Sequence, residues 1–88
     1  MEKRTKDYTV PGEVASVWIE CTALLRLRDV YAKLPFGYKK AKRAGLEAQN
    51  ARSKFWRMIR GLYPDELADK VLHYDDETQT CWGVDVDA

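Results

Sequence analysis

The stretch at residues 13–34, EVASVWIECTALLRLRDVYAKL, decides the fold of this 88-residue chain. A helical period of 3.6 residues sorts its apolar side chains onto two separate faces of one helix. The main face holds Val14, Val17, Trp18, Cys21, Leu24, Leu25, Tyr31 and Ala32. A second, narrower face on nearly the opposite side holds Ile19, Ala23, Leu27, Val30 and Leu34. Because a surface helix needs only one apolar face, we expect this helix to be covered from two sides.

A second helix is expected after a short connection. Pro35 disfavours helical geometry at Leu34, so the first helix should span residues 12–33. A second helical pattern then spans residues 38–60. Its heptad-like apolar seam, which continues just past this range, is formed by Ala41, Ala44, Ala48, Ala51, Phe55, Met58 and Leu62. Two long helices joined by a short loop pack antiparallel. The sequence therefore predicts a long antiparallel helical hairpin.

The rest of the chain predicts smaller elements around this hairpin. Residues 1–10 are expected to form a flexible N-terminal arm. Residues 64–72 predict a short third helix, with Leu67, Val71 and Leu72 able to cover the second face of the first helix. Residues 73–88 form either an extended tail or a small β-hairpin that turns about residues 76–79. The expected fold class is mostly α, with residues 11–88 as a single helical domain.

Charge is strongly segregated along the chain, although the formal net charge is only +1. Residues 1–32 carry five basic and five acidic groups, and residues 33–60 carry nine basic groups and one acidic group. Residues 61–88 carry eight acidic groups and one basic group. Opposite charges of this size, separated along one chain, indicate electrostatic contacts within the chain, between copies or with a partner.

The basic stretch forms a stripe on the outer side of the second helix. Such a stripe either tracks the phosphates of a nucleic acid or is an ordinary solvated helix face. Its candidate contacts for a nucleic acid or another anion are Lys39, Lys42, Arg43, Lys54, Arg57 and Arg60.

The acidic stretch has three interpretations. It folds back on the basic stripe of the same chain, reaches the stripe of a second copy, or presents carboxylates to a basic partner protein. The predicted acidic partner surface consists of Asp65, Asp75, Asp76, Glu77, Asp85 and Asp87.

Arg28 and Arg52 fall on the apolar faces of their helices, where an unpaired buried charge is costly. An antiparallel hairpin places residue 52 opposite residues 19–20, so we expect a buried Glu20–Arg52 pair, with Glu47 serving Arg28. The alternative is a pocket for an anionic small ligand, since arginine and aromatic side chains together suit phosphate groups. That pocket would be lined by Arg28, Arg52, Trp18 and Tyr31.

Nothing in the sequence predicts catalysis, a metal site or a cofactor. Cys21, Cys81 and His73 lack the spacings of metal ligands, and no nucleophile stands in a recognisable setting. No apolar run approaches the roughly 18 residues of a membrane span. No export signal follows the charged N-terminus, so we expect a cytoplasmic protein with reduced thiols.

These observations predict a small non-enzymatic regulatory or adaptor protein that acts by protein–protein interaction. It is expected to bind itself, as a dimer or higher homo-oligomer, and a second protein, without contacting a membrane. The first alternative is a nucleic-acid-binding module that uses the basic stripe. The second is a binder of anionic small ligands through Arg28 and Arg52.

Overall fold

A computed structural model describes residues 4–86 of the chain. The fold is the predicted long helical hairpin with a short third helix and a small antiparallel sheet. Within the described residues, two compact units form, one from residues 16–55 and the other from residues 4–15 and 56–86. The elements in chain order are β1 (Tyr8–Thr9), α1 (Gly12–Ala32), α2 (Tyr38–Leu62), α3 (Pro64–Leu67), β2 (Lys70–Asp75) and β3 (Thr80–Asp85).

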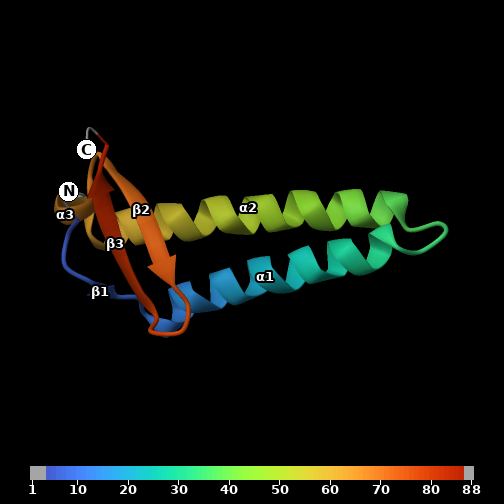
Figure 1. Cartoon of the computed structure of the whole chain (residues 1–88), viewed down its shortest axis with the longest axis horizontal. Coiled ribbons are helices and arrows are strands. Elements are labelled where there is room, and N and C mark those ends of the chain that lie inside the picture. Colours follow the sequence, from blue (N-terminus) through green and yellow to red (C-terminus); the bar gives the residue numbers. More distant parts are fainter. Residues whose placement is uncertain (1–3, 87–88) are drawn as a thin grey trace. The chain divides into compact units, whose positions relative to one another are not determined.

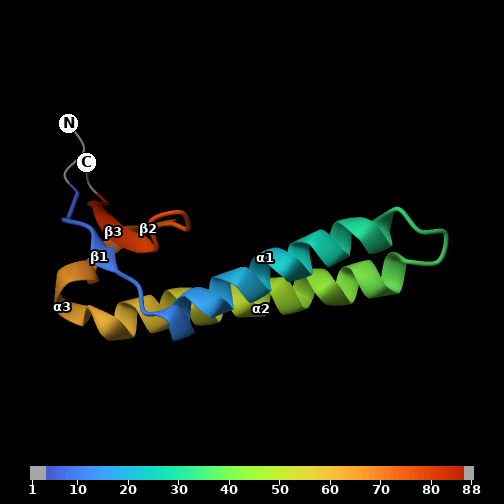
Figure 2. The same ribbon diagram turned by 90° about the horizontal axis from the view of Figure 1, so that it is seen from below.

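Residues 16–55 form the body of the hairpin, in which α1 and α2 run side by side in opposite directions (Figures 1 and 2). The thiol of Cys21 lies in this interface and donates a hydrogen bond to the Ala48 carbonyl at 3.3 Å. The rings of Trp18 and Phe55 meet with their centroids 5.1 Å apart. Small side chains dominate the buried set, which comprises Val17, Cys21, Ala41, Ala44, Ala48, Ala51 and Phe55. The two backbones therefore approach closely over much of the hairpin.

The turn of the hairpin requires a glycine at position 37. The Leu34 amide donates to the Tyr31 carbonyl at 3.1 Å, and the Gly37 amide donates to the Leu34 carbonyl at 3.2 Å. A Cβ atom on residue 37 would lie 1.8 Å from the Tyr31 carbonyl oxygen, far inside van der Waals contact. Any other residue would have to open this turn.

The second unit is built on a three-stranded antiparallel sheet in the order β1-β3-β2. Its register pairs His73 with Trp82 and Tyr74 with Cys81, while Tyr8 pairs with Cys81 from the other side. The buried apolar residues of this unit are Val10, Val14, Ala15, Ile59, Leu67, Cys81 and Val84. The β-hairpin is the second of the two alternatives that the sequence left open for the chain after residue 72.

Residues 4–9 lie against this sheet, where the sequence predicted a flexible arm. Arg4 forms an isolated β-bridge with Val84, and the Thr5 amide donates to the Gly83 carbonyl at 2.9 Å. The Tyr63 hydroxyl donates to the carbonyl of Thr9 at 2.7 Å. The first residues of the predicted arm, 1–3, lie outside the described residues.

The predicted third helix over residues 64–72 is wrong in its second half. Helix α3 ends at Leu67, and β2 begins at Lys70. Asp69 has a φ of 58°, which breaks the helix between them. The Arg60 guanidinium donates to the carbonyls of Leu67 and Lys70 at 3.3 and 3.2 Å, which satisfies backbone groups at this break. Val71 and Leu72 are therefore strand residues.

Candidate interaction site

The second face of α1 is exposed to solvent. Ile19 is 67% exposed, Leu27 43% and Val30 55%, and Ala23 and Leu34 are also exposed. The predicted cover for this face included Val71, which is itself 49% exposed. An exposed apolar stripe of this kind is a candidate surface for binding another molecule.

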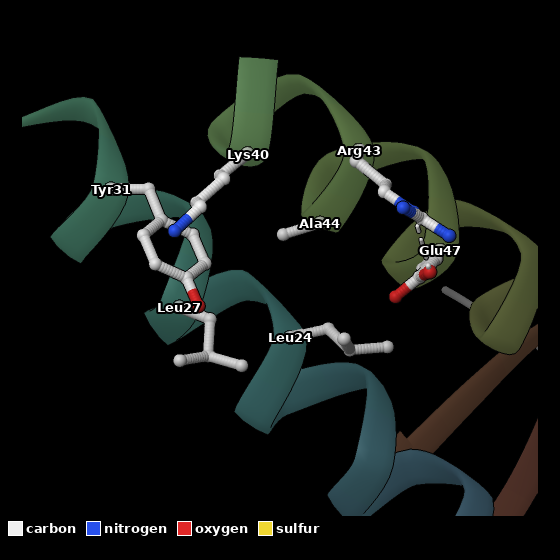
Figure 3. A pocket seen from close by; sticks show the side chains of 7 residues that line it. All are labelled: Leu24, Leu27, Tyr31, Lys40, Arg43, Ala44 and Glu47. Atoms are coloured by element: carbon white, nitrogen blue, oxygen red, sulfur yellow. Dashed lines mark ion pairs between the residues drawn. The ribbon is translucent and has the colours of Figure 1, made fainter. Parts of the chain in front are cut away.

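A groove adjoins this face along the line where α1 meets α2. Figure 3 shows its α1 wall, formed by Leu24, Leu27 and Tyr31, opposite side chains that come from α2. The groove encloses about 260 Å³, and its α2 wall consists of Lys40, Arg43, Ala44 and Glu47. Leu27 belongs both to the groove and to the second face, so the α1 wall of the groove continues into that face.

The polar rim of the groove is held by two contacts. The Lys40 ammonium lies 5.7 Å from the centroid of the Tyr31 ring, in a cation–π contact. Arg43 and Glu47, one helical turn apart on α2, form an ion pair with 3.5 Å between Nε and Oε1 (Figure 3). These contacts place charged side chains along the α2 side of the rim, opposite the leucines of α1.

Two charged residues flank the second face on α1. Glu20 and Arg26 are both exposed, and neither side chain forms an ion pair or hydrogen bond with any residue of the described range 4–86. Arg26 was missed from the sequence as a site residue. The sequence did contain a signal for Arg26. Glu20 precedes Ala23 by three residues and Arg26 follows it by three, so the two opposite charges are spaced symmetrically about Ala23.

The predicted buried cluster of Glu20, Arg28 and Arg52 is not buried. All three side chains are exposed, Arg28 pairs with Asp29 at 3.3 Å, and Glu47 pairs with Arg43 instead of Arg28. Within residues 4–86, no ion pair joins Glu20 to Arg52. The physical reason is that arginine side chains are long enough to carry their charge from a helix interface out to solvent.

The pocket predicted as the alternative forms only in part. Arg28 and Arg52 do line one cavity, on the other side of the hairpin from Leu27. Tyr31 lines the groove of Figure 3 instead. Trp18 contacts Phe55.

All six residues of the predicted basic stripe are exposed on α2. Two of them are engaged: Arg43 with Glu47, and Arg60 with the backbone carbonyls of Leu67 and Lys70. In the described part of the chain, no ion pair or hydrogen bond forms at Lys39, Lys42, Lys54 or Arg57.

The predicted acidic surface is divided among different roles. Asp85 forms an ion pair with Lys70 across the β2–β3 ladder, and Asp75 accepts a hydrogen bond from the Glu77 amide at 3.0 Å. Asp65, Asp76 and Glu77 have exposed side chains on α3 and in the β-hairpin turn. Asp87 lies outside the described residues.

The exposed side of the sheet carries a stack that the sequence did not reveal. The Arg4 guanidinium lies 4.3 Å from the Trp82 ring centroid, and the His73 ring stacks on Trp82 at 5.6 Å with 13° between the planes. Only the register of β2 against β3 brings His73 beside Trp82, and that register is not evident before the strands are known.

Both cysteines are buried free thiols. Burial, with a smaller contribution from the Asp7 carboxylate, raises the pKa of the Cys81 thiol. Among residues 4–86, no three His, Cys, Asp or Glu side chains gather as a metal site. The described helices include none that is long and apolar enough to cross a membrane.

Comparisons of the chain with models of protein families, with curated proteins and with solved structures found no match.

Proposed function

We propose that this chain is a small non-enzymatic regulatory or adaptor protein of the cytoplasm that works by protein–protein interaction and associates with itself. The observation that carries this proposal is the exposed apolar second face of α1, with Ile19, Leu27 and Val30 between 43 and 67% exposed. Burying such side chains contributes roughly 25 cal/mol for each Å² of apolar surface removed from water. We propose a second copy of the chain as the partner that covers this face, because charged and apolar side chains of α1 match those of a second α1.

The matching chemistry is a charge pattern that is symmetric about Ala23. An antiparallel pairing of two α1 helices, with the two-fold axis at Ala23, places positions equally far before and after Ala23 against each other. Glu20 then meets Arg26 of the second copy, and each supplies the opposite charge that the other lacks within its own chain.

The same pairing also satisfies the apolar side chains. Ile19 lies four residues before Ala23 and Leu27 lies four residues after it, so each faces the other across the axis. The small Ala23 side chain at the axis allows the two helices to approach closely. The Leu27 end of this contact opens into the groove of Figure 3, which offers further apolar surface from Leu24 and Tyr31.

The test is the molar mass in solution, measured by light scattering at low and at high salt. The full chain is expected to be an oligomer whose mass persists at high salt, because its interface is mainly apolar. Leu27→Asp is expected to reduce the mass to that of one chain while the helical circular dichroism persists. Asn50→Asp is the matched control, since Asn50 is exposed on α2 and the change adds the same charge. A wild-type mass of one chain would overturn the proposal, as would an unchanged mass for Leu27→Asp.

The adaptor role requires a second partner, and the exposed carboxylates of Asp65, Asp76 and Glu77 favour a basic protein. Their exposure leaves them available to a partner without breaking the Asp85–Lys70 pair of the sheet. Neutralising the three together, as Asn and Gln, is expected to lower the association rate for such a partner and leave self-association unchanged.

The unpaired cations of α2 favour nucleic-acid binding as a second candidate function. Lys39, Lys42, Lys54 and Arg57 lack a carboxylate partner within residues 4–86. If these residues contact phosphates, affinity for a mixed oligonucleotide pool falls steeply with salt. Lys54→Gln should then weaken binding and make the salt dependence shallower. A pool that leaves the protein unbound at low salt would exclude this candidate.

A further inference from the structure

A second cavity lies along the hairpin and takes no part in the proposed self-association. It encloses about 320 Å³ between α1 and α2. Leu25 lines it, and Leu25 and Leu27 point to nearly opposite sides of α1, so the two cavities lie on opposite sides of the hairpin. Its lining residues are Cys21, Leu25, Arg28, Gly45, Ala48, Gln49 and Arg52.

The polar side chains of this cavity are hydrogen-bond donors, and two of them carry a positive charge. Arg28 comes from α1, and Gln49 and Arg52 come from α2, while no carboxylate lines the cavity. The Arg52 side chain has no ion pair or hydrogen bond with any residue between 4 and 86. Arg28 is paired only with its neighbour Asp29, at 3.3 Å and with both side chains substantially exposed. Two arginines thus line one cavity that no carboxylate lines.

The innermost lining of the cavity, between the two helices, is apolar and limits the access of water from that side. Cys21 and Ala48 are buried there, and their hydrogen bond of 3.3 Å ties the two helices together beneath the arginines. A charge-assisted contact is stronger at such a partly desolvated wall than on an open helix surface.

Gly45 leaves room for the Arg28 side chain, at a cost to helix stability. A glycine inside a helix is less stable than alanine by about 1 kcal/mol. A Cβ atom at position 45 would lie 3.3 Å from the Cδ of Arg28, so the arginine stem lies directly across the glycine. The chain thus places a destabilising glycine, an arginine on an apolar helix face and an unpaired arginine around one cavity. Local violations that coincide in this way are typical of binding sites.

We propose that this cavity binds a small molecule through a doubly charged phosphate group. The planar donors of two arginines match the oxygens of a phosphate, and the Gln49 amide can donate a further hydrogen bond. The volume accommodates a pyrophosphate or the phosphate end of a larger metabolite. The phosphate supplies the negative charge that the lining lacks.

Calorimetric titration of the full-length protein tests the proposal, with inorganic phosphate, pyrophosphate and a nucleoside diphosphate as probes at constant ionic strength. Pyrophosphate is expected to bind at a single site. Tighter binding of the nucleoside diphosphate would identify an organic phosphate as the ligand, and equal binding would identify the free anion. No heat from any of the three probes at millimolar concentration would overturn the proposal.

Three variants separate this site from the general positive charge of α2. Arg28→Gln and Arg52→Gln are each expected to weaken pyrophosphate binding at least tenfold. Arg57→Gln removes the same charge from the outer side of α2 and is expected to change the affinity less than twofold. Equal losses in all three variants would mean that pyrophosphate responds only to net charge, and would overturn the site.

Gly45→Ala gives a readout that a purely structural role of Arg28 would not produce. Alanine favours the helix, so the melting temperature is expected to hold or rise, while the displaced Arg28 lowers the pyrophosphate affinity at least threefold. Unchanged affinity in Gly45→Ala would contradict the placement of Arg28 in the site.

Discussion

At the scale of single residues, the two phenylalanines of this chain occupy opposite environments. Phe55 is fully buried in the hairpin and contacts Trp18, whereas Phe36 is 98% exposed in the turn. The sequence predicted the burial of Phe55, because it continues the alanine seam at helical spacing. It offered no reason to single out Phe36, since a turn residue has no period from which its exposure can be read.

The pair of phenylalanines provides a matched test of the hairpin core. Phe55→Ala is expected to lower the free energy of unfolding by about 3–5 kcal/mol, because it removes a large buried ring and leaves a cavity. Phe36→Ala should change it by less than about 0.5 kcal/mol. Urea unfolding followed by circular dichroism measures both. Equal effects for the two substitutions would contradict the packing described for Phe55.

The buried thiol of Cys81 predicts a pH dependence of stability. Its pKa is raised in the folded protein, so the unfolded chain loses this proton at a lower pH than the folded chain does. The contribution of this thiol to the free energy of unfolding is therefore constant below the ordinary thiol pKa, near 9.0. As the pH rises above that value, the stability of the folded protein falls. Unfolding measured from pH 7 to 10 should show a steeper fall for the wild type than for Cys81→Ala. Parallel curves would refute this role of the thiol.

At the scale of elements, sequence periodicity predicted the helical hairpin because burial repeats every 3.6 residues over α1 and α2. The same reasoning failed after Leu67. Leu67 and Val71 have helical spacing, but the positive φ of Asp69 and the pairing of β2 with β3 override it. Strand pairing depends on residues far away in the sequence. The sequence of residues 70–75 alone therefore does not determine whether they form a helix or pair as a strand.

The sequence likewise predicted some features of the candidate site and missed others. The second face of α1 follows from periodicity alone, and its residues are exposed in the structure. That something outside one chain covers this face stays a prediction. The predicted ion pairs of Arg28 and Arg52 failed, because spacing along a helix does not determine whether a long side chain turns inward or reaches solvent. That both arginines nevertheless line one cavity depends on the hairpin register and on the absent side chain at Gly45.

Charge reversal tests the antiparallel pairing of α1 proposed above. Glu20→Arg and Arg26→Glu alone should each weaken self-association about tenfold, equivalent to about 1.4 kcal/mol, because each places like charges together. The double variant should recover the wild-type affinity. Mixing the two single variants should also restore association, since each then supplies the charge that the other needs. Sedimentation velocity measures all four samples, and failure of both the double variant and the mixture would exclude this register.

At the scale of the whole molecule, the charges of the sequence are divided between the two compact units. Residues 16–55 carry nine basic and three acidic groups, whereas the remaining residues of the chain carry six basic and eleven acidic groups. A protein built from two oppositely charged units attracts copies of itself over distances of about 10 Å at moderate salt. Under the proposed self-association, this attraction affects how fast copies meet, and the apolar face of α1 affects how long they stay together.

Self-association should therefore be visible in thermal stability. If folding and association are coupled, the melting temperature of the wild type should rise by about 3–5 °C for each tenfold increase in protein concentration. Leu27→Asp removes the coupling, so its melting temperature should be lower and independent of concentration. Differential scanning calorimetry over two decades of concentration measures this. A concentration-independent wild type would show that one chain folds without its copy.

The order of the sheet also has a consequence for how the protein is made. The central strand β3 is synthesised last, yet it provides the pairing for both β1 and β2. During translation the helices of the hairpin are complete before any strand has its partner. Residues 8–9 can pair with β3 only after more than 70 further residues have been synthesised. The hairpin thus emerges first, and under the proposed self-association its apolar face is available to a second copy before the sheet has formed.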